Sequence, residues 1–270
     1  MSESPILQSL EQGVLYLALN RPERRNAMSL AVVEELLAAC AAVAENHNVR
    51  TIVIRGTAGN FCAGGDISDM AMARQEAMAG NADSFKNLNR RFGDLLCQVN
   101  EQPQTVVCVT EGAVLGGGVG LACVADITLS TTTAQFGLPE TTLGIIPAQI
   151  APFLVQRIGL TATRRLALTG ARFNGDEAAR LGVVHQAVPE EELDALLATT
   201  LKQITQCAPG ANRTTKALLF DTLRRPLEDV LDDAATAFAN AVQSKEGAEG
   251  TMAFMQKRPP AWAAQGENDE

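Results

Sequence analysis

Three adjacent glycines stand where a ligand-binding helix could begin. Gly116, Gly117 and Gly118 follow an apolar run in the segment EGAVLGGGVGLACVAD (111–126), and Gly120 is a fourth. Glycine inside a helix costs about 0.5–1 kcal/mol relative to alanine. At a helix N-terminus, however, glycine lets a ligand approach bare backbone N–H groups, and the helix dipole there favours negative charge. Such donors could hold a ligand oxygen that becomes anionic during a reaction, although close packing of a helix on a strand would also need glycines.

Two common glycine motifs do not fit this segment. A dinucleotide-binding fingerprint would place a third glycine where Leu121 stands, and a phosphate-binding P-loop would need Lys followed by Ser or Thr. The loop GNFCAGGDISDM (59–70) has a similar design, because it follows a predicted buried strand and precedes a predicted helix. Two backbone loops of this kind could each supply one N–H to the same oxygen.

Hydrophobic periodicity predicts the elements that would position these loops. Alternating or β-branched runs predict strands over 13–20, 49–56, 105–112 and 127–132, with a short strand at 183–188. Helical spacing predicts helices over 30–45, over 84–100, and from the glycine cluster to about residue 125. From Pro147 onward helical patterns dominate. Strands and helices in the first half and helices in the last third predict an α/β fold with a helical C-terminal part.

Composition and charge exclude several classes of partner and site. The 270 residues carry a formal net charge of −9, whereas nucleic acids and anionic membranes attract clustered Lys and Arg. The longest uncharged apolar stretch, 112–125, is too short to cross a bilayer, and the N-terminus lacks the pattern of a secretory signal. Six scattered cysteines without a Cys-x-x-Cys pair are typical of reduced cytoplasmic thiols, and two histidines leave little material for a metal site. We therefore expect a cytoplasmic protein with no metal, no nucleic-acid partner and no membrane partner.

Five segments, in order along nearly the whole chain, resemble the successive signatures of one enzyme family, the enoyl-CoA hydratase/isomerase (crotonase) superfamily. They are LNRPERRNAMS (19–29), FCAGGDISDM (61–70), EGAVLGGGVGLACVAD (111–126), FGLPETTLGIIPAQIAPFLVQRIG (136–159) and EGTMAFMQKRPPAW (249–262). The resemblance implies a crotonase-like α/β fold. Its parts would be a spiral of ββα units over 1–200 and a C-terminal α-helical region over 201–262, used to form a homotrimer or a dimer of trimers. The remaining residues, 263–270, are predicted to be a disordered tail.

The same resemblance implies the catalytic groups. Members of the family bind acyl-CoA thioesters and stabilise their enolates, so coenzyme A enters with the substrate and no separate cofactor is expected. The two amides of the oxyanion hole, which hold the thioester oxygen, fall on Ala63 and on the middle glycine, Gly117, and the acid/base glutamate falls on Glu140. An apolar pocket would raise the pKa of Glu140 toward the working range. Without the resemblance, Glu140 would be interpreted as a solvated loop residue after Pro139.

Coenzyme A is a polyanion, so cationic side chains are expected at the entrance of its site. The family's CoA-lining positions match Arg24, Arg25, Ala27, Asp66, Ile67, Phe254 and Lys257, the last two sometimes acting from a neighbouring subunit. Alternatively, the cationic members of this set are plain surface charges and Phe254 belongs to the core. Cys62 is interpreted as packing, while Met70 and Met72 line either an acyl tunnel or the core.

One position departs from the family pattern. Hydratases of this family carry a second glutamate, which helps to bind water, where this chain has Gly120. The motif around Glu140 and the glycine segment resemble the isohexenylglutaconyl-CoA hydratases of bacterial terpene breakdown, with 3-methylglutaconyl-CoA hydratases as near neighbours. We hypothesise that the substrate's distal carboxylate or the amide of Gln149 orders the water. A general enoyl-CoA hydratase, a Δ3-Δ2 enoyl-CoA isomerase with a single glutamate, and a non-catalytic acyl-CoA binder are the alternatives.

Overall fold

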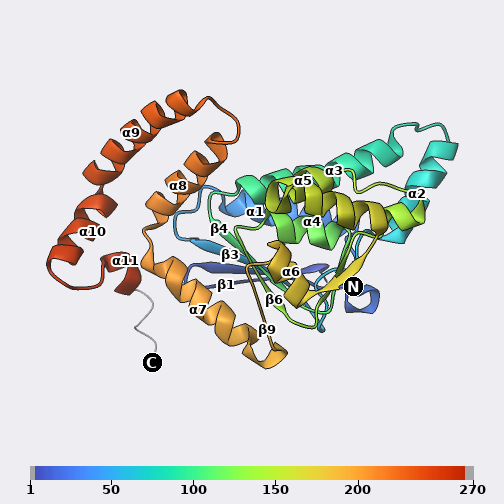
Figure 1. Cartoon of the computed structure of the whole chain (residues 1–270), viewed down its shortest axis with the longest axis horizontal. Helices are drawn as coiled ribbons and strands as arrows, with labels where there is room; N and C mark the ends of the chain where they lie inside the picture. The colour runs from blue at the N-terminus through green and yellow to red at the C-terminus, as the bar shows by residue number, and fades with distance from the viewer. Residues whose placement is uncertain (1–3, 265–270) are drawn as a thin grey trace.

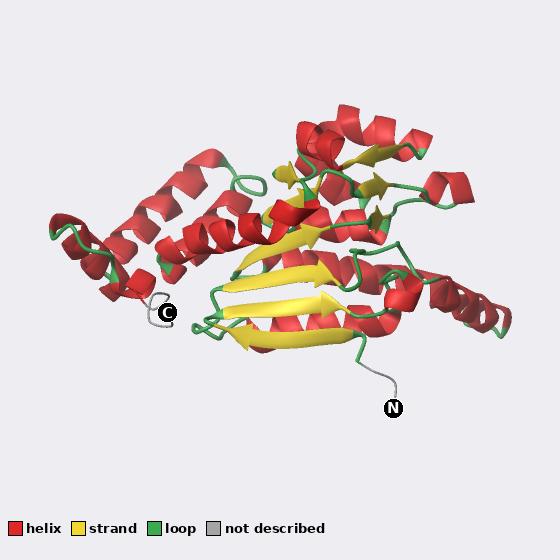
Figure 2. Cartoon of the chain, turned by 90° about the horizontal axis from the view of Figure 1, so that it is seen from below, coloured by secondary structure: helices red, strands yellow, loops and turns green. Residues whose placement is uncertain are grey.

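The computed structural model describes residues 4–264 and contains a main sheet of six strands in the order β1-β2-β3-β4-β6-β9. All neighbouring strands pair in parallel except β1 and β2, which form an antiparallel hairpin. Figure 2 shows this sheet with its parallel strands pointing away from the C-terminal helices. Its strands are β1 (Ile6–Glu11), β2 (Val14–Leu19), β3 (Thr51–Gly56), β4 (Thr105–Thr110), β6 (Ile127–Thr131) and β9 (Gln186–Val188).

Helices cover both faces of the main sheet, which is why β3 and β4 are almost wholly buried and have apolar residues at their centres. Ile52 and Ile54 of β3 belong to one core, shared with α1 (Leu30–Val43), α3 (Ser84–Glu101), α4 (Gly117–Val124) and α5 (Ala151–Thr169). Val53, on the opposite face of the same strand, belongs to a second core that includes Leu193 and Leu197 of α7 (Leu193–Gln206). Figure 1 shows α7 on one side of the sheet and the other four helices on the opposite side.

A second, smaller sheet has the order β5-β7-β8. Its strands are β5 (Ala113–Leu115), β7 (Gln135–Gly137) and β8 (Arg172–Asn174). β5 runs directly from the end of β4 into α4, and β7 runs from the end of β6 toward Glu140. The remaining elements of this half are η1 (Pro22–Arg24), α2 (Ile67–Met78), η2 (Glu140–Leu143), α6 (Gly175–Leu181) and η3 (Glu190–Glu192). Three pairs of strands are each followed by a helix, β1 and β2 by α1, β4 and β5 by α4, and β6 and β7 by α5, whereas β3 is a single strand before α2 and α3.

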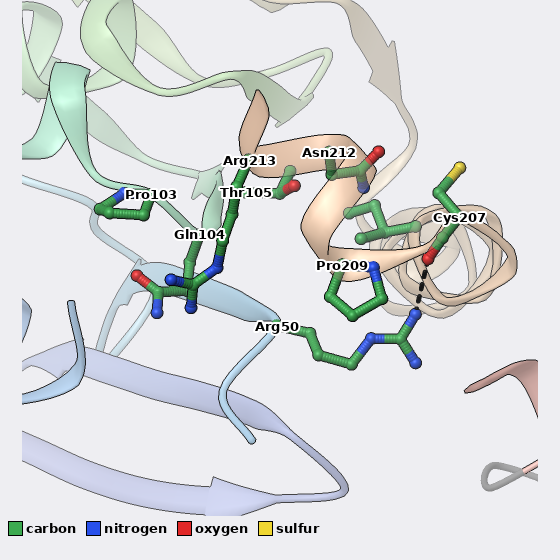
Figure 3. A pocket seen from close by; sticks show the side chains of 9 residues that line it. Arg50, Pro103, Gln104, Thr105, Cys207, Pro209, Asn212 and Arg213 are labelled. Carbon is green, nitrogen blue, oxygen red and sulfur yellow. Dashed lines mark hydrogen bonds between the residues drawn. The ribbon is translucent and has the colours of Figure 1, made fainter. Parts of the chain in front are cut away.

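The C-terminal helices extend from the amino end of the main sheet (Figures 1 and 2). They are α8 (Pro209–Asp221), α9 (Leu227–Gln243), α10 (Lys245–Met255) and α11 (Ala261–Ala264). Three cations anchor them. Arg50 donates to the carbonyl oxygen of Cys207 at 2.8 Å, Arg213 donates to that of Ala44 at 3.1 Å, and Lys216 pairs with Asp126 at 2.6 Å. Figure 3 shows Arg50 and Arg213 on either side of Pro209, where α8 begins.

The predicted elements are present with small changes at their ends. The strands expected at 13–20, 49–56, 105–112 and 127–132 and the helix expected at 30–45 end within two residues of the observed bounds. The predicted boundary at residue 200 falls inside α7, whose buried face packs on the sheet, so the helices that leave the sheet begin with α8. Of the predicted tail, 263 and 264 belong to α11, and 265–270 lie outside the described residues. No helix within residues 4–264 is long and apolar enough to span a bilayer.

Candidate active site

Pairing between one loop and one short strand brings the two glycine-containing loops together. The Cys62 N–H donates to the Ala113 carbonyl at 2.8 Å, and the Leu115 N–H donates to the Cys62 carbonyl at 2.9 Å. This is a parallel bridge between Cys62 and β5. Ala63 directly follows Cys62, and Gly117 follows Leu115 by two residues. Because paired parallel segments leave at the same edge, both predicted oxyanion residues lie beyond the carboxyl ends of β3 and β4.

The glycines at the start of α4 allow this close approach. A β-carbon on Gly118 would lie 2.8 Å from the Cys62 carbonyl oxygen, so only glycine lets the helix contact the loop there. Gly116 has a φ of +50°, which an L side chain rarely adopts. The packing explanation for the glycine cluster is therefore correct for Gly118, and it does not compete with a role in binding.

The Gly117 amide is bare. Its N–H has no hydrogen-bond acceptor in the part of the chain that the structure describes. A β-carbon on Gly117 would lie 3.2 Å from the Phe92 ring, so the α-carbon faces an aromatic side chain of α3. A donor at the first residue of a helix, beside an apolar ring, is suited to holding developing negative charge.

The Ala63 amide is occupied. Its N–H donates to the carbonyl oxygen of Arg25 at 3.0 Å. A thioester oxygen at this amide must therefore share or replace the Arg25 carbonyl. The sequence contains no signal for this contact, because it joins residues 38 positions apart along the chain through backbone atoms alone.

Glu140 lies at the first position of η2, and its carboxyl group faces the two loops. A β-carbon on Gly116 would lie 2.7 Å from Glu140 Oε1 and 3.7 Å from the α-carbon of Gly64. Glu140 Oε2 is buried without a hydrogen-bond partner among residues 4–264. Burial raises the pKa of the Glu140 carboxyl, although its own backbone N–H partly offsets the effect. The interpretation as a solvated loop glutamate is wrong, and the expected direction of the pKa shift is confirmed.

The position of the missing second glutamate is enclosed by apolar groups. A β-carbon on Gly120 would lie 3.1 Å from Ile150 Cγ1 and 3.4 Å from Leu96 Cδ1. Gln149, which precedes Ile150, donates from Nε2 to Asn89 Oδ1 at 3.0 Å, and its Oε1 lies against Gly93 of α3. The surroundings of Gly120, one turn along α4 from Gly116, are thus apolar, and the amide of Gln149 lies beside them.

Some of the predicted CoA-lining residues near the loops have unpaired polar groups, and others already use theirs in hydrogen bonds within the chain. Arg24 and Arg25 are exposed and have no ion-pair partner within residues 4–264, so both guanidinium groups are available to phosphates. Ala27 is already engaged through its backbone, since its N–H donates to the Arg24 carbonyl at 3.1 Å and its carbonyl accepts from Arg21 at 2.8 Å.

Asp66 has a structural role. Its carboxylate caps α2 by accepting the Ser68 N–H at 2.7 Å and pairs with Arg21 at 2.6 Å. Burial alone would raise the pKa of Asp66, but the hydrogen bonds from Ser68 and Arg21 outweigh it and hold the pKa below its usual range. Only the backbone of Asp66 is left for a ligand, whereas the next side chain, Ile67, is 80% exposed.

Phe254 and Lys257 do not join the other predicted residues within one chain. Phe254 lies on α10, at the end of the molecule opposite α2 (Figure 1), and its side chain is 85% exposed. The interpretation of Phe254 as a core residue is therefore wrong. Within the described residues, Phe254 and Lys257 therefore lie apart from the loops that carry Ala63 and Gly117.

The cysteine and methionine predictions are resolved by burial. Cys62 is fully buried, and burial raises the pKa of its thiol to about 11, which confirms a packing role. Met70 is 40% exposed and its methyl group lies near Gly65, while Met72 is 54% exposed. Neither methionine belongs to the core.

Sequence reasoning missed three residues that shape the site: Phe92, Arg21 and Asn26. Phe92 is one of several apolar residues of α3, and nothing in the helical spacing separates it from the others. Arg21 and Asn26 lie in the RPERRN segment, where a polar residue 1% exposed, such as Asn26, cannot be told from a solvated one by sequence alone.

Comparison with known proteins agrees with this geometry. The family model for enoyl-CoA hydratase/isomerase matches residues 9–265. The chain belongs to this family. The fold is accordingly crotonase-like, and the chain is an enoyl-CoA hydratase-type lyase that acts on an acyl-CoA thioester.

Individual relatives cover almost the whole chain. The solved structure of Pseudomonas aeruginosa AtuE is similar with a TM-score of 0.93 at 56% identity, covering 96% of this chain and 99% of that one. The probable enoyl-CoA hydratase echA8 of Mycobacterium bovis is 32% identical over 96% of this chain and 98% of its own length. The 2,3-dehydroadipyl-CoA hydratase of Escherichia coli is 28% identical, over 95% and 98% respectively.

Proposed function

We propose that this enzyme adds water to the conjugated double bond of a branched 2-enoyl-CoA thioester, with isohexenylglutaconyl-CoA as the substrate. The observation that carries the proposal is the carboxyl group of Glu140, which lies beside Gly116 and Gly64 and whose Oε2 is buried without a hydrogen-bond partner among the described residues. The resemblance of the segments around Glu140 and the glycine cluster to isohexenylglutaconyl-CoA hydratases supports this substrate over a linear one. A relative named for 2,3-dehydroadipyl-CoA, whose acyl group also ends in a carboxylate, agrees with an acyl site open to such groups.

In the proposed reaction, the thioester oxygen binds the N–H groups of Ala63 and Gly117, the first by displacing the Arg25 carbonyl. Ionised Glu140 removes a proton from water as the water oxygen bonds to the β-carbon, and the electron pair of the double bond moves onto the thioester oxygen. The two amides stabilise that enolate. Neutral Glu140 then gives its proton to the α-carbon, which restores the carbonyl and the carboxylate. Coenzyme A is part of the substrate, and the sequence of steps needs no further cofactor.

Water must be held without a second carboxylate, because Gly120 faces Ile150 and Leu96. The distal carboxylate of a glutaconyl substrate and the amide of Gln149 are the two groups that could order it. Gln149 is held to α3 by its bond to Asn89, which fixes the amide close to this wall. Gln149→Ala should therefore slow hydration, and unchanged hydration kinetics would leave the substrate carboxylate as the group that orders water.

A panel of branched and linear enoyl thioesters, with products weighed by mass spectrometry, tests the function. Hydration adds the mass of one water, and the branched glutaconyl thioesters should have the highest kcat/KM. Glu140→Gln should lose about 10²–10⁴-fold in kcat, the usual contribution of general acid–base catalysis, while acyl-CoA binding persists. Full activity of this variant would refute the role of Glu140. A preference for 3-methylglutaconyl-CoA or for linear substrates would reassign the acyl group within the same chemistry.

A Δ3-Δ2 enoyl-CoA isomerase is the second candidate, favoured by the single carboxyl group. Isomerisation moves a proton between two carbons and needs no bound water, so Glu140 could carry it out alone. The product would then have the mass of the substrate. A binder without catalysis would show no turnover with any thioester, and any CoA-dependent turnover excludes it.

We also propose that the enzyme assembles as a homotrimer or a dimer of trimers. Support comes from the C-terminal helices and the turn between α8 and α9, which expose large apolar side chains: Leu219, Leu223, Leu227, Leu231, Phe238, Phe254 and Met255. An exposed apolar surface of this kind is characteristic of an interface. A second copy is the occupant that would also bring Phe254 and Lys257 to a thioester bound on another chain.

A further inference from the structure

Two asparagine side chains connect the loops that carry the candidate site. Asn26 is 1% exposed, and its Oδ1 accepts the Arg21 N–H at 2.8 Å. Its Nδ2 donates to the carbonyl oxygens of Thr57 at 2.9 Å and Asn60 at 2.6 Å. Asn60 in turn accepts the Ala113 N–H through Oδ1 at 3.1 Å. The loop after β2, the loop after β3 and the start of β5 are thereby linked through two amide side chains.

Close packing of the neighbouring backbone fixes the position of Asn60 in addition to these hydrogen bonds. A β-carbon on Gly56 would collide with the Asn60 carbonyl oxygen, and one on Gly112 would lie 2.8 Å from Asn60 Oδ1. Backbone therefore packs against both sides of this residue. A displacement of Asn60 cannot be absorbed locally, because close-packed groups transmit strain to their neighbours.

The backbone that follows Asn60 sets the two amides of the candidate site. The Phe61 N–H donates to the Glu111 carbonyl at 2.9 Å, and the Cys62 bonds to Ala113 and Leu115 follow at once. The Asn60 side chain bonds to the Ala113 N–H, so it anchors the first residue of the strand that ends just before Gly116 and Gly117. The separation between the Ala63 and Gly117 amides thus depends on this pairing register.

Asn26 holds the conformation of the loop after β2, which contains Arg25. Arg25 and Asn26 both have left-handed backbone conformations, with φ values of 48° and 56°. Such conformations are unfavourable for residues other than glycine, although asparagine tolerates them better than most. The three side-chain bonds of Asn26 oppose this strain and hold the Arg25 carbonyl where it accepts the Ala63 N–H.

We propose that Asn26 and Asn60 are positioning residues for the thioester-oxygen site, setting the distance between the Ala63 and Gly117 amides without touching the substrate. The inference rests on the proposed function only in that these two amides bind the oxygen. It holds equally for a hydratase or an isomerase, because each reaction develops negative charge on the thioester oxygen, in a β-hydroxy enolate or in a dienolate respectively.

Asn60 is the residue to change, since Asn26 is buried and its loss would leave three backbone groups without partners. Asn60→Ala removes the acceptor of the Ala113 N–H but keeps the carbonyl that Asn26 binds. Asn60→Asp keeps that acceptor. Asn46→Ala is the matched control, because Asn46 Oδ1 accepts the Asn48 N–H at 3.0 Å in an exposed turn at the opposite end of β3.

Two readouts separate positioning from stability. The first is the split between kcat and KM for the best thioester of the substrate panel, measured well below the thermal midpoint. Asn60→Ala should lower kcat by about 10- to 100-fold, because a misplaced donor loses much of its effect, with KM unchanged. The second is the infrared carbonyl stretch of bound butyryl-CoA labelled with ¹³C at the thioester carbon. The wild-type protein should lower this frequency relative to free thioester, and Asn60→Ala should lower it less.

Asn60→Asp should recover both kcat and the frequency shift, and Asn46→Ala should match the wild type. An Asn60→Ala protein that loses thermal stability yet keeps kcat and the carbonyl shift would overturn the positioning role. If Asn60→Ala does not fold, Asn60→Ser takes its place in the same comparison with Asn60→Asp. If the wild-type protein itself produces no carbonyl shift, the oxygen site of the proposed function fails, which is a different result from a shift that Asn60→Ala leaves intact.

Discussion

Replacing Gly118 by alanine would put a methyl group into a close contact between the two loops of the site. The new β-carbon would lie 2.8 Å from the carbonyl oxygen and 2.9 Å from the β-carbon of Cys62. Both are atoms fixed by backbone, and Cys62 is itself held by two hydrogen bonds to β5. Because no flexible side chain can move aside, α4 and the Cys62 loop must separate.

The magnitude follows from two opposing effects. Overpacking costs about 1–3 kcal/mol, and a clash with atoms fixed by backbone belongs to the upper part of that range, about 2–3 kcal/mol, while the better helix propensity of alanine returns about 1 kcal/mol. The net loss of about 1–2 kcal/mol corresponds to a fall of about 2–8 °C in the thermal midpoint. The effect on kcat should be larger, about 10²-fold, because separation of the loops moves Ala63 away from Gly117 and weakens one donor.

Gly117→Ala provides the comparison for the loss of stability. Its β-carbon would meet the Phe92 ring at 3.2 Å, and a half-buried ring can tilt where a backbone carbonyl cannot. Thermal unfolding and steady-state kinetics of the two variants should therefore differ, with Gly118→Ala the less stable. A Gly118→Ala protein with the wild-type thermal midpoint and kcat would show that the loops can separate without loss, which would refute a fixed spacing between them.

Three further predictions concern protonation and assembly. Burial raises the pKa of Glu140, so kcat/KM should fall on the acid side around a midpoint above the ordinary glutamate value of 4.5, and a pH–rate profile with its acid limb at or below that value would contradict this. Burial, and then the charge of Arg157, lower the pKa of His185 below 6.5, so the unfolded chain binds more protons than the folded chain and the free energy of unfolding should decrease as pH falls below 6.5. Urea titrations at several pH values should show a weaker decrease for His185→Gln than for the wild type. An identical decrease would exclude His185 as its source. Phe238 is 72% exposed on α9, so Phe238→Asp should lower the molar mass measured by light scattering, and an unchanged mass would place the interface elsewhere.

The first strand illustrates a limit of periodicity. β1 has a single buried side chain, Ile6, and the other five are exposed, so no alternation predicts it. The strand forms because its backbone pairs with β2 across the turn at Gln12 and Gly13, both with positive φ. β5, β7 and β8 are three residues each, too short for any pattern, and depend in the same way on partners distant in sequence.

The amino-acid sequence alone determined the buried strands, the helix that begins at Leu30 and the glycine cluster, and the family resemblance of its motifs singled out Glu140 as the acid/base carboxyl group. These follow from local spacing or from motifs whose residues are contiguous. Only the tertiary structure decided that the Arg25 carbonyl accepts the Ala63 N–H and that the Asp66 carboxylate pairs with Arg21 and caps α2. It also decided that Phe254 lies at the opposite end of the molecule from α2. Each of those outcomes is a contact, or the lack of one, between segments whose separation along the chain carries no information about their distance in space.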